Sequence, residues 1–277
     1  MDKDRIDSVV EAAVKEDLPE GDITSESLIP LHHRSKAFIE AREKGVLAGL
    51  EVAERVFRFI DPSLDFKRLW EDGKEFEKGD QMVQLEGSSI SLLKGERTAL
   101  NFLQRLSGIA TRTHQFYKEV QGTSTQILDT RKTTPGLRIL EKYAVKTGGG
   151  KNHRFNLSEM VLIKDNHLKV VGSIREAVQR AKKRGQSGIK IEVETSSLEE
   201  VKEAVQSGAH MVMLDNMSFE EMEKVLKWGR GKVLFEVSGN VELSQVRSIA
   251  SLGVDYISVG SLTHSYNSMD ISMEFLG

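Results

Sequence analysis

The chain has 277 residues, and its 39 Lys and Arg against 42 Asp and Glu give a formal net charge of −3. This balance excludes binding of nucleic acid through bulk positive charge. The absence of cysteine excludes disulfides, thiolate metal sites and a cysteine nucleophile. The first residues lack the apolar core of a signal peptide, and no apolar run is long enough to span a membrane, so we expect a soluble, cytoplasmic protein.

The first hundred residues predict an α+β region. A loop is expected over Glu16–Ser25, which contains Pro19 and Gly21. Helical spacing of apolar residues predicts helices over Ile6–Lys15, Gly49–Ile60 and Ser89–Val120, the last with a candidate break at Gly108. Alternating apolar and polar residues predict antiparallel strands over Ala37–Ala41, Leu64–Leu69 and Gln81–Leu85.

From about residue 126 onward the chain repeats a strand followed by an amphipathic helix. Ser197 and Ser218, each followed three residues later by Glu, are typical helix starts, and Gly208, Gly229 and Gly253 are expected helix ends. Six short runs with little polar alternation predict strands buried on both faces of a parallel sheet. These runs are Gln126–Leu128, Met160–Ile163, Ile189–Val193, Met211–Leu214, Val233–Val237 and Tyr256–Val259.

Such alternation indicates a (β/α) barrel or an open doubly wound sheet. Because six strands are two short of a full barrel, we expect an α/β protein with an incomplete or modified (β/α) barrel. The predicted domains are an N-terminal α+β sandwich-like domain, 1–108, and a barrel domain, 109–277. The final residues are free to pack back on the first domain.

Polar or glycine-rich segments follow each predicted strand. In barrels and open α/β sheets, functional groups collect just beyond the carboxyl ends of the strands, so six such segments in succession indicate a ligand site at one face. The segments are Asp129–Lys132, Lys164–His167, Glu194–Thr195, Asp215–Asn216, Ser238–Asn240 and Gly260–Ser261.

Positive charge is concentrated between Asp129 and His167, where eight Lys and Arg face four Asp and Glu. Arg138, Lys142 and Lys146 are interpreted as the solvated face of a helix over Pro135–Thr147. Arg131, Lys132 and Lys164 fall at strand ends instead, and such a cluster favours an anionic substrate, since Arg binds carboxylate or phosphate through two parallel hydrogen bonds.

Gly148–Gly150 is either a flexible lid or a helix stop, and it matches neither a Walker A loop nor a dinucleotide fingerprint. The position of this glycine segment in the chain is expected to bring His153 and Arg154 beside the basic strand ends.

Two carboxylates, Glu194 and Asp215, end neighbouring strands. They can hold Mg²⁺, hydrogen-bond sugar hydroxyls or stabilise a developing positive charge, or instead pair with Lys132 and Lys164 in a structural network. Glu192 lies on the same side of its strand as Glu194, and either residue can be the functional carboxylate.

The small residues of Ser238–Asn240 and Val259–Ser261 follow the last two strands, where barrels commonly bind phosphate.

Together these segments closely resemble the quinolinate phosphoribosyltransferase family, also called nicotinate-nucleotide pyrophosphorylase (carboxylating). One departure is Ser238-Gly239-Asn240, where many family members have Ser-Gly-Gly. The resemblance covers nearly the whole chain and rests on Glu16–Thr24, Glu96–Asn101, Asp129–Arg138, Gly148–Arg154, Leu162–His167, Glu192–Glu194 and Gly253–His264.

The resemblance implies the type II phosphoribosyltransferase fold and a reaction of quinolinate with phosphoribosyl pyrophosphate in the presence of Mg²⁺. The products are nicotinate mononucleotide, pyrophosphate and CO₂, in NAD biosynthesis. It also implies a homodimer or hexamer in which Arg97 enters the site of a partner subunit. Lys132, Lys164, Glu194 and Asp215 are the implied catalytic residues, and Glu194 and Asp215 the implied metal ligands, directly or through water. The implied substrate-binding residues are Arg97, Thr130, Arg131, Lys132, His153, Arg154, Lys164, Glu194, Asp215, Ser238, Gly239, Asn240, Val259, Gly260 and Ser261.

Two other functions fit the charged cluster without the resemblance. One is a Schiff-base aldolase that uses Lys164 or Lys132, because a strand-end lysine in a barrel suits that chemistry. The other is a barrel without catalytic activity that binds an anionic metabolite as a sensor.

Overall fold

The computed structural model describes residues 3–185 and 188–276, so the predicted domain limits at residues 1 and 277 lie outside it. The described chain forms two compact units. The first contains the described residues of Met1–His114, Thr133–Gly149 and Leu262–Gly277, and the second those of Gln115–Lys132 and Gly150–Ser261. The linear division at residue 108 stays a prediction. None of the helices in the described ranges combines the length and apolar character that crossing a membrane requires.

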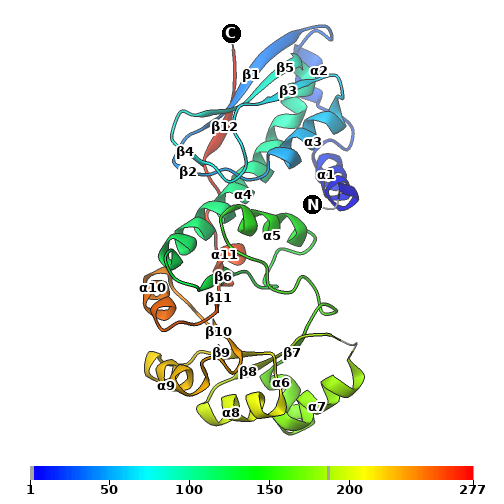
Figure 1. Ribbon diagram of the computed structural model, residues 1–277. Helices are drawn as coiled ribbons and strands as arrows, with labels where there is room; N and C mark the ends of the chain where they lie inside the picture. Colours follow the sequence, from blue (N-terminus) through cyan, green and yellow to red (C-terminus); the bar gives the residue numbers. More distant parts are fainter. Residues whose placement is uncertain (1–2, 186–187, 277) are drawn as a thin grey trace. The chain divides into compact units, whose positions relative to one another are not determined.

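A four-stranded antiparallel sheet forms the centre of the first unit (Figure 1). The C-terminal strand, red in Figure 1, pairs with the first strand so that Met273 lies opposite Ile39. Ala37, Ile39 and Ala41 are fully buried because alternate side chains of a strand point to the same face. In sheet order the strands are β12 (Ile271–Phe275), β1 (Arg34–Ala41), β5 (Gln81–Ser88) and β3 (Asp65–Arg68); β2 (Gly45–Val46) and β4 (Glu75–Phe76) form a separate pair.

The helices predicted for this region form as α1 (Lys3–Asp17), α3 (Leu50–Ile60) and α4 (Ser89–Val120). The candidate break at Gly108 is wrong, because α4 continues through it. A Cβ atom there would lie 2.1 Å from the carbonyl oxygen of Asn267, so this glycine permits close approach of two backbone segments.

The predicted loop after the first helix is shorter than expected. The carboxylate of Asp22 accepts the backbone N–H groups of Thr24 and Ser25 and so begins α2 (Ile23–Leu28), which the sequence analysis did not predict.

Helix α5 (Arg138–Thr147) begins three residues later than predicted. Gly136, with φ 82°, has a left-handed backbone that a helix cannot include. The prediction that Lys142 lies on a solvated face is wrong, since the residue is 1% exposed. The neighbouring Glu141 is also buried and accepts hydrogen bonds from the Arg105 guanidinium and the Thr134 backbone, so α5 is covered on its polar side as well.

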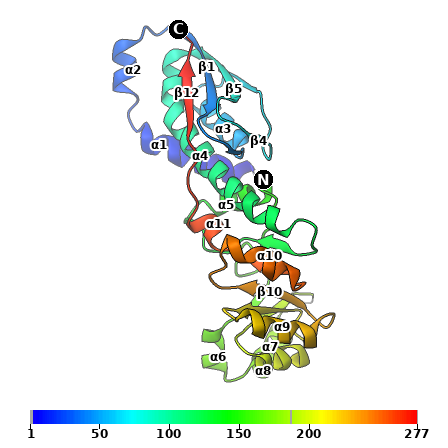
Figure 2. The same cartoon turned by 90° about the vertical axis from the view of Figure 1, so that its left-hand side faces the viewer.

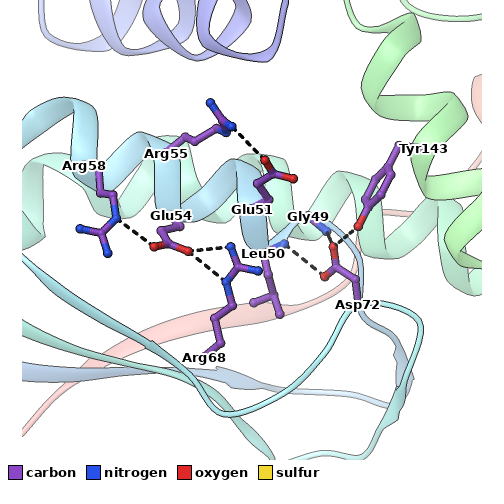
Figure 3. Close-up of polar contacts among 9 residues, drawn as sticks. All are labelled: Gly49, Leu50, Glu51, Glu54, Arg55, Arg58, Arg68, Asp72 and Tyr143. Carbon is purple, nitrogen blue, oxygen red and sulfur yellow. Dashed lines mark hydrogen bonds and ion pairs between the residues drawn. The ribbon is translucent and has the colours of Figure 1, made fainter. Parts of the chain in front are cut away.

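The start of α3 is held by a carboxylate from a distant segment (Figure 3). Asp72 accepts the N–H groups of Gly49 and Leu50 at 2.9 and 3.2 Å, and the Tyr143 hydroxyl donates to it at 2.6 Å. These bonds satisfy free donors of the first helical turn and fix α5 to α3.

Six parallel strands form the sheet of the second unit. Within residues 3–185 and 188–276, β6 and β7 are the edges of this sheet, which is therefore an open, incomplete barrel, as predicted. In sheet order the strands are β6 (Gln126–Leu128), β11 (Tyr256–Ser258), β10 (Leu234–Ser238), β9 (Met211–Asp215), β8 (Ile191–Thr195) and β7 (Val161–Ile163).

Helices connect these strands, and α7, α8 and α9 lie along the sheet (Figures 1 and 2). Both predicted serine caps form: Ser197 Oγ accepts the N–H of Glu200 at 3.2 Å, and Ser218 Oγ that of Glu221 at 3.3 Å. The helices are α6 (Asp165–Val171), α7 (Ile174–Arg184), α8 (Leu198–Ser207), α9 (Phe219–Gly229), α10 (Leu243–Ser251) and the short α11 (Ser261–His264).

Candidate active site

The carboxyl ends of the parallel strands bring several predicted site residues to one edge of the second unit. Glu194 is the next-to-last residue of β8, and Asp215 and Ser238 are the last residues of β9 and β10. Asp215 lies directly opposite Ser238 in the parallel register. Acidic and small residues therefore stand side by side along this edge.

A lysine and a glutamate from neighbouring strands form an ion pair at the same edge. Lys164 follows β7, and its ammonium contacts the Glu194 carboxylate. The lysine side chain is 43% exposed and the glutamate 14%. This contact is the pairing that the structural-network interpretation expects. The lysine end of this ion pair is open to solvent, which weakens the pair, so an anionic ligand can compete for the ammonium.

Two arginines of the predicted basic cluster influence each other. Burial lowers the pKa of Arg154, and the positive charge of Arg131 lowers it further, against the attraction of Glu192. The Arg154 guanidinium also donates to the carbonyl oxygen of Met160 at 3.0 Å. Like charges held close together in a half-buried place are stabilised by an anion between them, which makes this pair a candidate carboxylate or phosphate site.

His153 adjoins Arg154 and contacts two carboxylates of the sheet. Its side chain is 8% exposed, and its Nε2 lies 3.0 Å from Glu192 Oε2 and 3.3 Å from Glu236 Oε2. Its Nδ1 accepts the backbone N–H of Arg154 at 2.8 Å, and its own backbone N–H donates to Asp129 Oδ1 at 2.9 Å.

Two members of the His153–Glu192–Glu236 cluster, His153 and Glu192, have pKa values above their usual range. Burial raises the pKa of Glu192 to about 7, against the hydrogen bond from His153. Burial lowers the pKa of His153, but the two carboxylates outweigh this effect and raise that pKa to about 9. The ligand atoms of the cluster lie within 4.8 Å of one another, a spacing that also admits a metal ion.

Glu236 is the member that the sequence analysis missed. It lies in the middle of the apolar run that predicts β10 and is fully buried. A single acidic residue inside an otherwise apolar strand was the available signal, because a buried carboxylate requires a polar partner.

The predicted phosphate segment Ser238–Asn240 borders a cavity of about 440 Å³ between the ends of β9 and β10 and the starts of the helices that follow. Asn240 has φ 47°, in the left-handed region that glycine favours and asparagine tolerates. Gly239 has φ 95°, and a Cβ there would lie 2.4 Å from Asn216 Oδ1.

The remaining predicted residues lie at separate places. Thr130 Oγ1 accepts the N–H of Lys132 at 3.0 Å and so shapes the loop after β6. Val259 is buried and donates its N–H to Leu128, ahead of Gly260 and Ser261. Arg97 is exposed on α4 in the first unit. The structure thus joins Lys164 with Glu194, and Arg154 with both Arg131 and His153.

An open parallel sheet with cations, carboxylates and a small-residue loop at its carboxyl edge defines an α/β protein with a candidate site for an anionic small molecule at that edge. Comparisons with known proteins make this more specific. Residues 22–107 match the family model "Quinolinate phosphoribosyl transferase, N-terminal domain", and residues 109–274 match its counterpart for the C-terminal domain.

Relatives match over nearly their full length. The "Probable nicotinate-nucleotide pyrophosphorylase (carboxylating)" of Synechocystis is 42% identical over 98% of this chain and 92% of its own. The protein of the same name from Bacillus subtilis is 40% identical over 94% and 89%. The crystal structure of NadC from Streptococcus pyogenes, at 41% identity, covers 100% of this chain and 99% of its own with a TM-score of 0.96. The chain belongs to the quinolinate phosphoribosyltransferase family, and both the predicted family and the predicted fold are confirmed.

Proposed function

We propose that this protein transfers the phosphoribosyl group of phosphoribosyl pyrophosphate (PRPP) to quinolinate with loss of CO₂. The products are nicotinate mononucleotide and pyrophosphate, and the reaction serves NAD biosynthesis. The observation that carries this proposal is the match of both family domains over residues 22–107 and 109–274. The exposed lysine and paired arginines of the second unit suit substrates that carry only negative charge.

Quinolinate carries two adjacent carboxylates, and the basic residues account for their binding. In this proposal the dicarboxylate is held by Arg131, Lys132, His153, Arg154 and Lys164, with Arg97 from a partner subunit. Lys164 exchanges its partner Glu194 for a substrate carboxylate, which frees Glu194 for the ribose of PRPP.

Glu194 and Asp215 are the proposed ligands of Mg²⁺. The donor set fits this ion, because both side chains offer carboxylate oxygens, are partly exposed and end neighbouring strands. Bound Mg²⁺ supplies positive charge that offsets the negative charge of the pyrophosphate leaving group.

The loops Ser238–Asn240 and Val259–Ser261 are proposed to hold the 5′-phosphate of PRPP through their backbone N–H groups.

The chemistry needs orientation and charge rather than a covalent nucleophile. The quinolinate nitrogen forms a bond to ribose C1 as the bond to pyrophosphate breaks, through an oxocarbenium-like state next to Glu194 and Asp215. The carboxylate beside the now cationic nitrogen then leaves as CO₂. Its electron pair stays on the ring carbon, which takes up one proton. Lys132 and Lys164 orient the ring so that its nitrogen faces C1.

A homodimer or hexamer is part of the proposal. Arg97 is exposed on α4, away from the strand ends in sequence, and is proposed to complete the site of a partner subunit.

The direct test is to mix the purified protein with quinolinate, PRPP and Mg²⁺ and to measure pyrophosphate and CO₂. We expect both in equal amounts. We expect nicotinate to react very poorly, because cations arranged for the missing carboxylate are left without a partner. Equal rates with nicotinate, or no pyrophosphate from quinolinate, would reject the proposed reaction.

A further inference from the structure

Two fully buried carboxylates lie within the sheet of the second unit. Glu192 in β8 and Glu236 in β10 are both 0% exposed. Among the residues that the structure describes, Glu192 Oε1 and both oxygens of Glu236 have no hydrogen-bond partner. Burying such groups is costly, and both carboxylates form an ion pair with the imidazole of His153. The fold therefore places considerable negative charge around a single histidine ring.

The contacts of His153 determine which of its nitrogens carries a proton. Nδ1 accepts the backbone N–H of Arg154 at 2.8 Å, so its lone pair faces that donor. A neutral imidazole then carries its proton on Nε2, which faces Glu192 and Glu236. A metal ion among the three side chains would need the Nε2 lone pair, so this geometry favours a hydrogen-bonded cluster over a metal site.

His153 also connects two segments that carry basic residues. Through Nδ1 it holds the backbone of Arg154, and through its own N–H it holds Asp129, two residues before Arg131. The backbone of the His153 segment runs beside β6, where Lys151 N–H donates to Ile127 and Asp129 N–H donates to Lys151. The ring of His153 thus holds the Arg154 segment, and the backbone of His153 ties that segment to the loop that carries Arg131.

We infer that Glu192 and Glu236 are positioning residues: they lock His153, which sets Arg131 and Arg154 at the spacing that the two carboxylates of quinolinate require. The inference rests on the proposed function, which supplies quinolinate as the ligand. It changes the expected role of His153 from a direct substrate ligand to the link between the buried carboxylates and the two arginines.

Nitrogen NMR of the whole protein with ¹⁵N-labelled histidine tests the state of the ring, with His153→Asn used to assign the signal. In spectra recorded above pH 9, where the ring is neutral, we expect Nδ1 to be unprotonated and Nε2 protonated, both in the free protein and after addition of quinolinate without PRPP. Conversion of Nδ1 to the protonated form by quinolinate would show direct contact with a substrate carboxylate and overturn the inference. The free-protein spectrum tests the cluster even if the protein forms no pyrophosphate, a result that would reject only the proposed function.

Kinetics of Glu236→Gln test positioning separately. We expect the KM for quinolinate to rise about 10- to 100-fold while the KM for PRPP stays near that of the wild type, because a small displacement of both arginines affects only the dicarboxylate. Glu199→Gln, at an exposed position of α8, is the matched control and should change neither constant. An unchanged KM for quinolinate, or equal rises in both constants, would reject positioning.

A double variant shows whether the effect passes through the histidine. In the His153→Asn background, Glu236→Gln should add nothing further to the KM for quinolinate, whereas independent action would make the two effects multiply. Thermal unfolding checks that each variant is folded. If Glu236→Gln does not fold, the histidine spectra of the wild type alone test whether His153 is held by the buried carboxylates.

Discussion

Arg131 and Arg154 are the residues on which substrate charge should act most directly. Burial lowers the pKa of Arg154 and the positive charge of Arg131 lowers it further, so the Arg154 guanidinium is more stable with an anion present. We expect Arg131→Ala and Arg154→Ala each to lower kcat/KM for quinolinate by about 30- to several thousand-fold, corresponding to roughly 2–5 kcal/mol. Arg131→Lys should not restore activity, because an ammonium cannot form two parallel hydrogen bonds. Near-normal steady-state kinetics in either alanine variant would contradict this assignment.

The loop after β10 offers a test based on backbone conformation. Gly239→Ala places a Cβ 2.4 Å from Asn216 Oδ1 at φ 95°. We expect the free energy of unfolding to fall by about 1–2 kcal/mol and the KM for PRPP to rise. Asn240→Gly is the control, because glycine suits φ 47° and should leave both quantities near the wild type. A harmless Gly239→Ala would show that this loop adjusts freely.

For single residues, the sequence predicted position at a strand end correctly but did not predict the burial of charged side chains. Lys164, Glu194 and Asp215 were identified because each follows or ends an apolar strand, a position visible in one dimension. Lys142 was misplaced and Glu236 was missed. Their burial depends on which segments pack against them, and the amphipathic pattern of a single helix or strand does not contain that information.

Among the elements, α4 gives a clear test of why glycine occupies a helix interior. Alanine is a better helix former than glycine by about 1 kcal/mol, so propensity alone predicts that Gly108→Ala is stabilising. The Cβ would lie 2.1 Å from the Asn267 carbonyl oxygen, which cannot move without shifting the backbone. We therefore expect a loss of about 1–3 kcal/mol in urea unfolding. Gln115→Ala, at an exposed position of α4, should cause little change. A gain in stability from Gly108→Ala would show that the two backbones can separate.

Element boundaries were predictable where local signals fix them. The six parallel strands form within two residues of the expected positions, because each is an apolar run between turn residues. The start of α3 was also predicted to within one residue, but the contacts from Asp72 and Tyr143 that hold it were not, because these residues are far away in sequence. No local pattern reports such a contact.

For the whole molecule, the His153 cluster predicts how stability changes with pH. The folded protein raises the pKa of His153 from 6.5 to about 9. A raised pKa in the folded state contributes stability that is complete below pH 6.5 and is lost as the pH rises towards 9. Glu192 and Glu236 face the ring, and Arg154 adjoins it. We expect the urea midpoint to fall across this range, and less steeply in Glu236→Gln. Parallel curves for the two proteins would contradict the prediction.

Subunit mixing tests the proposed assembly. Arg97→Ala and Arg131→Ala should each be nearly inactive alone. With random pairing, half of the dimers are mixed, and in each mixed dimer one site inherits neither defect, so about a quarter of wild-type activity should return. Measured pyrophosphate release that stays at the level of the single variants, despite proven subunit exchange, would show that Arg97 acts within its own chain.

The pairing of β12 with β1 has a consequence for the order in which the protein matures during synthesis. All six strands of the parallel sheet, residues 126–258, leave the ribosome before Ile271–Phe275. Until then β1 presents an open edge on the side that β12 later covers, and exposed edges promote association with other chains. We therefore expect the first unit to complete its sheet last, although its synthesis begins first. Slower translation near the C-terminus would then prolong the aggregation-prone interval.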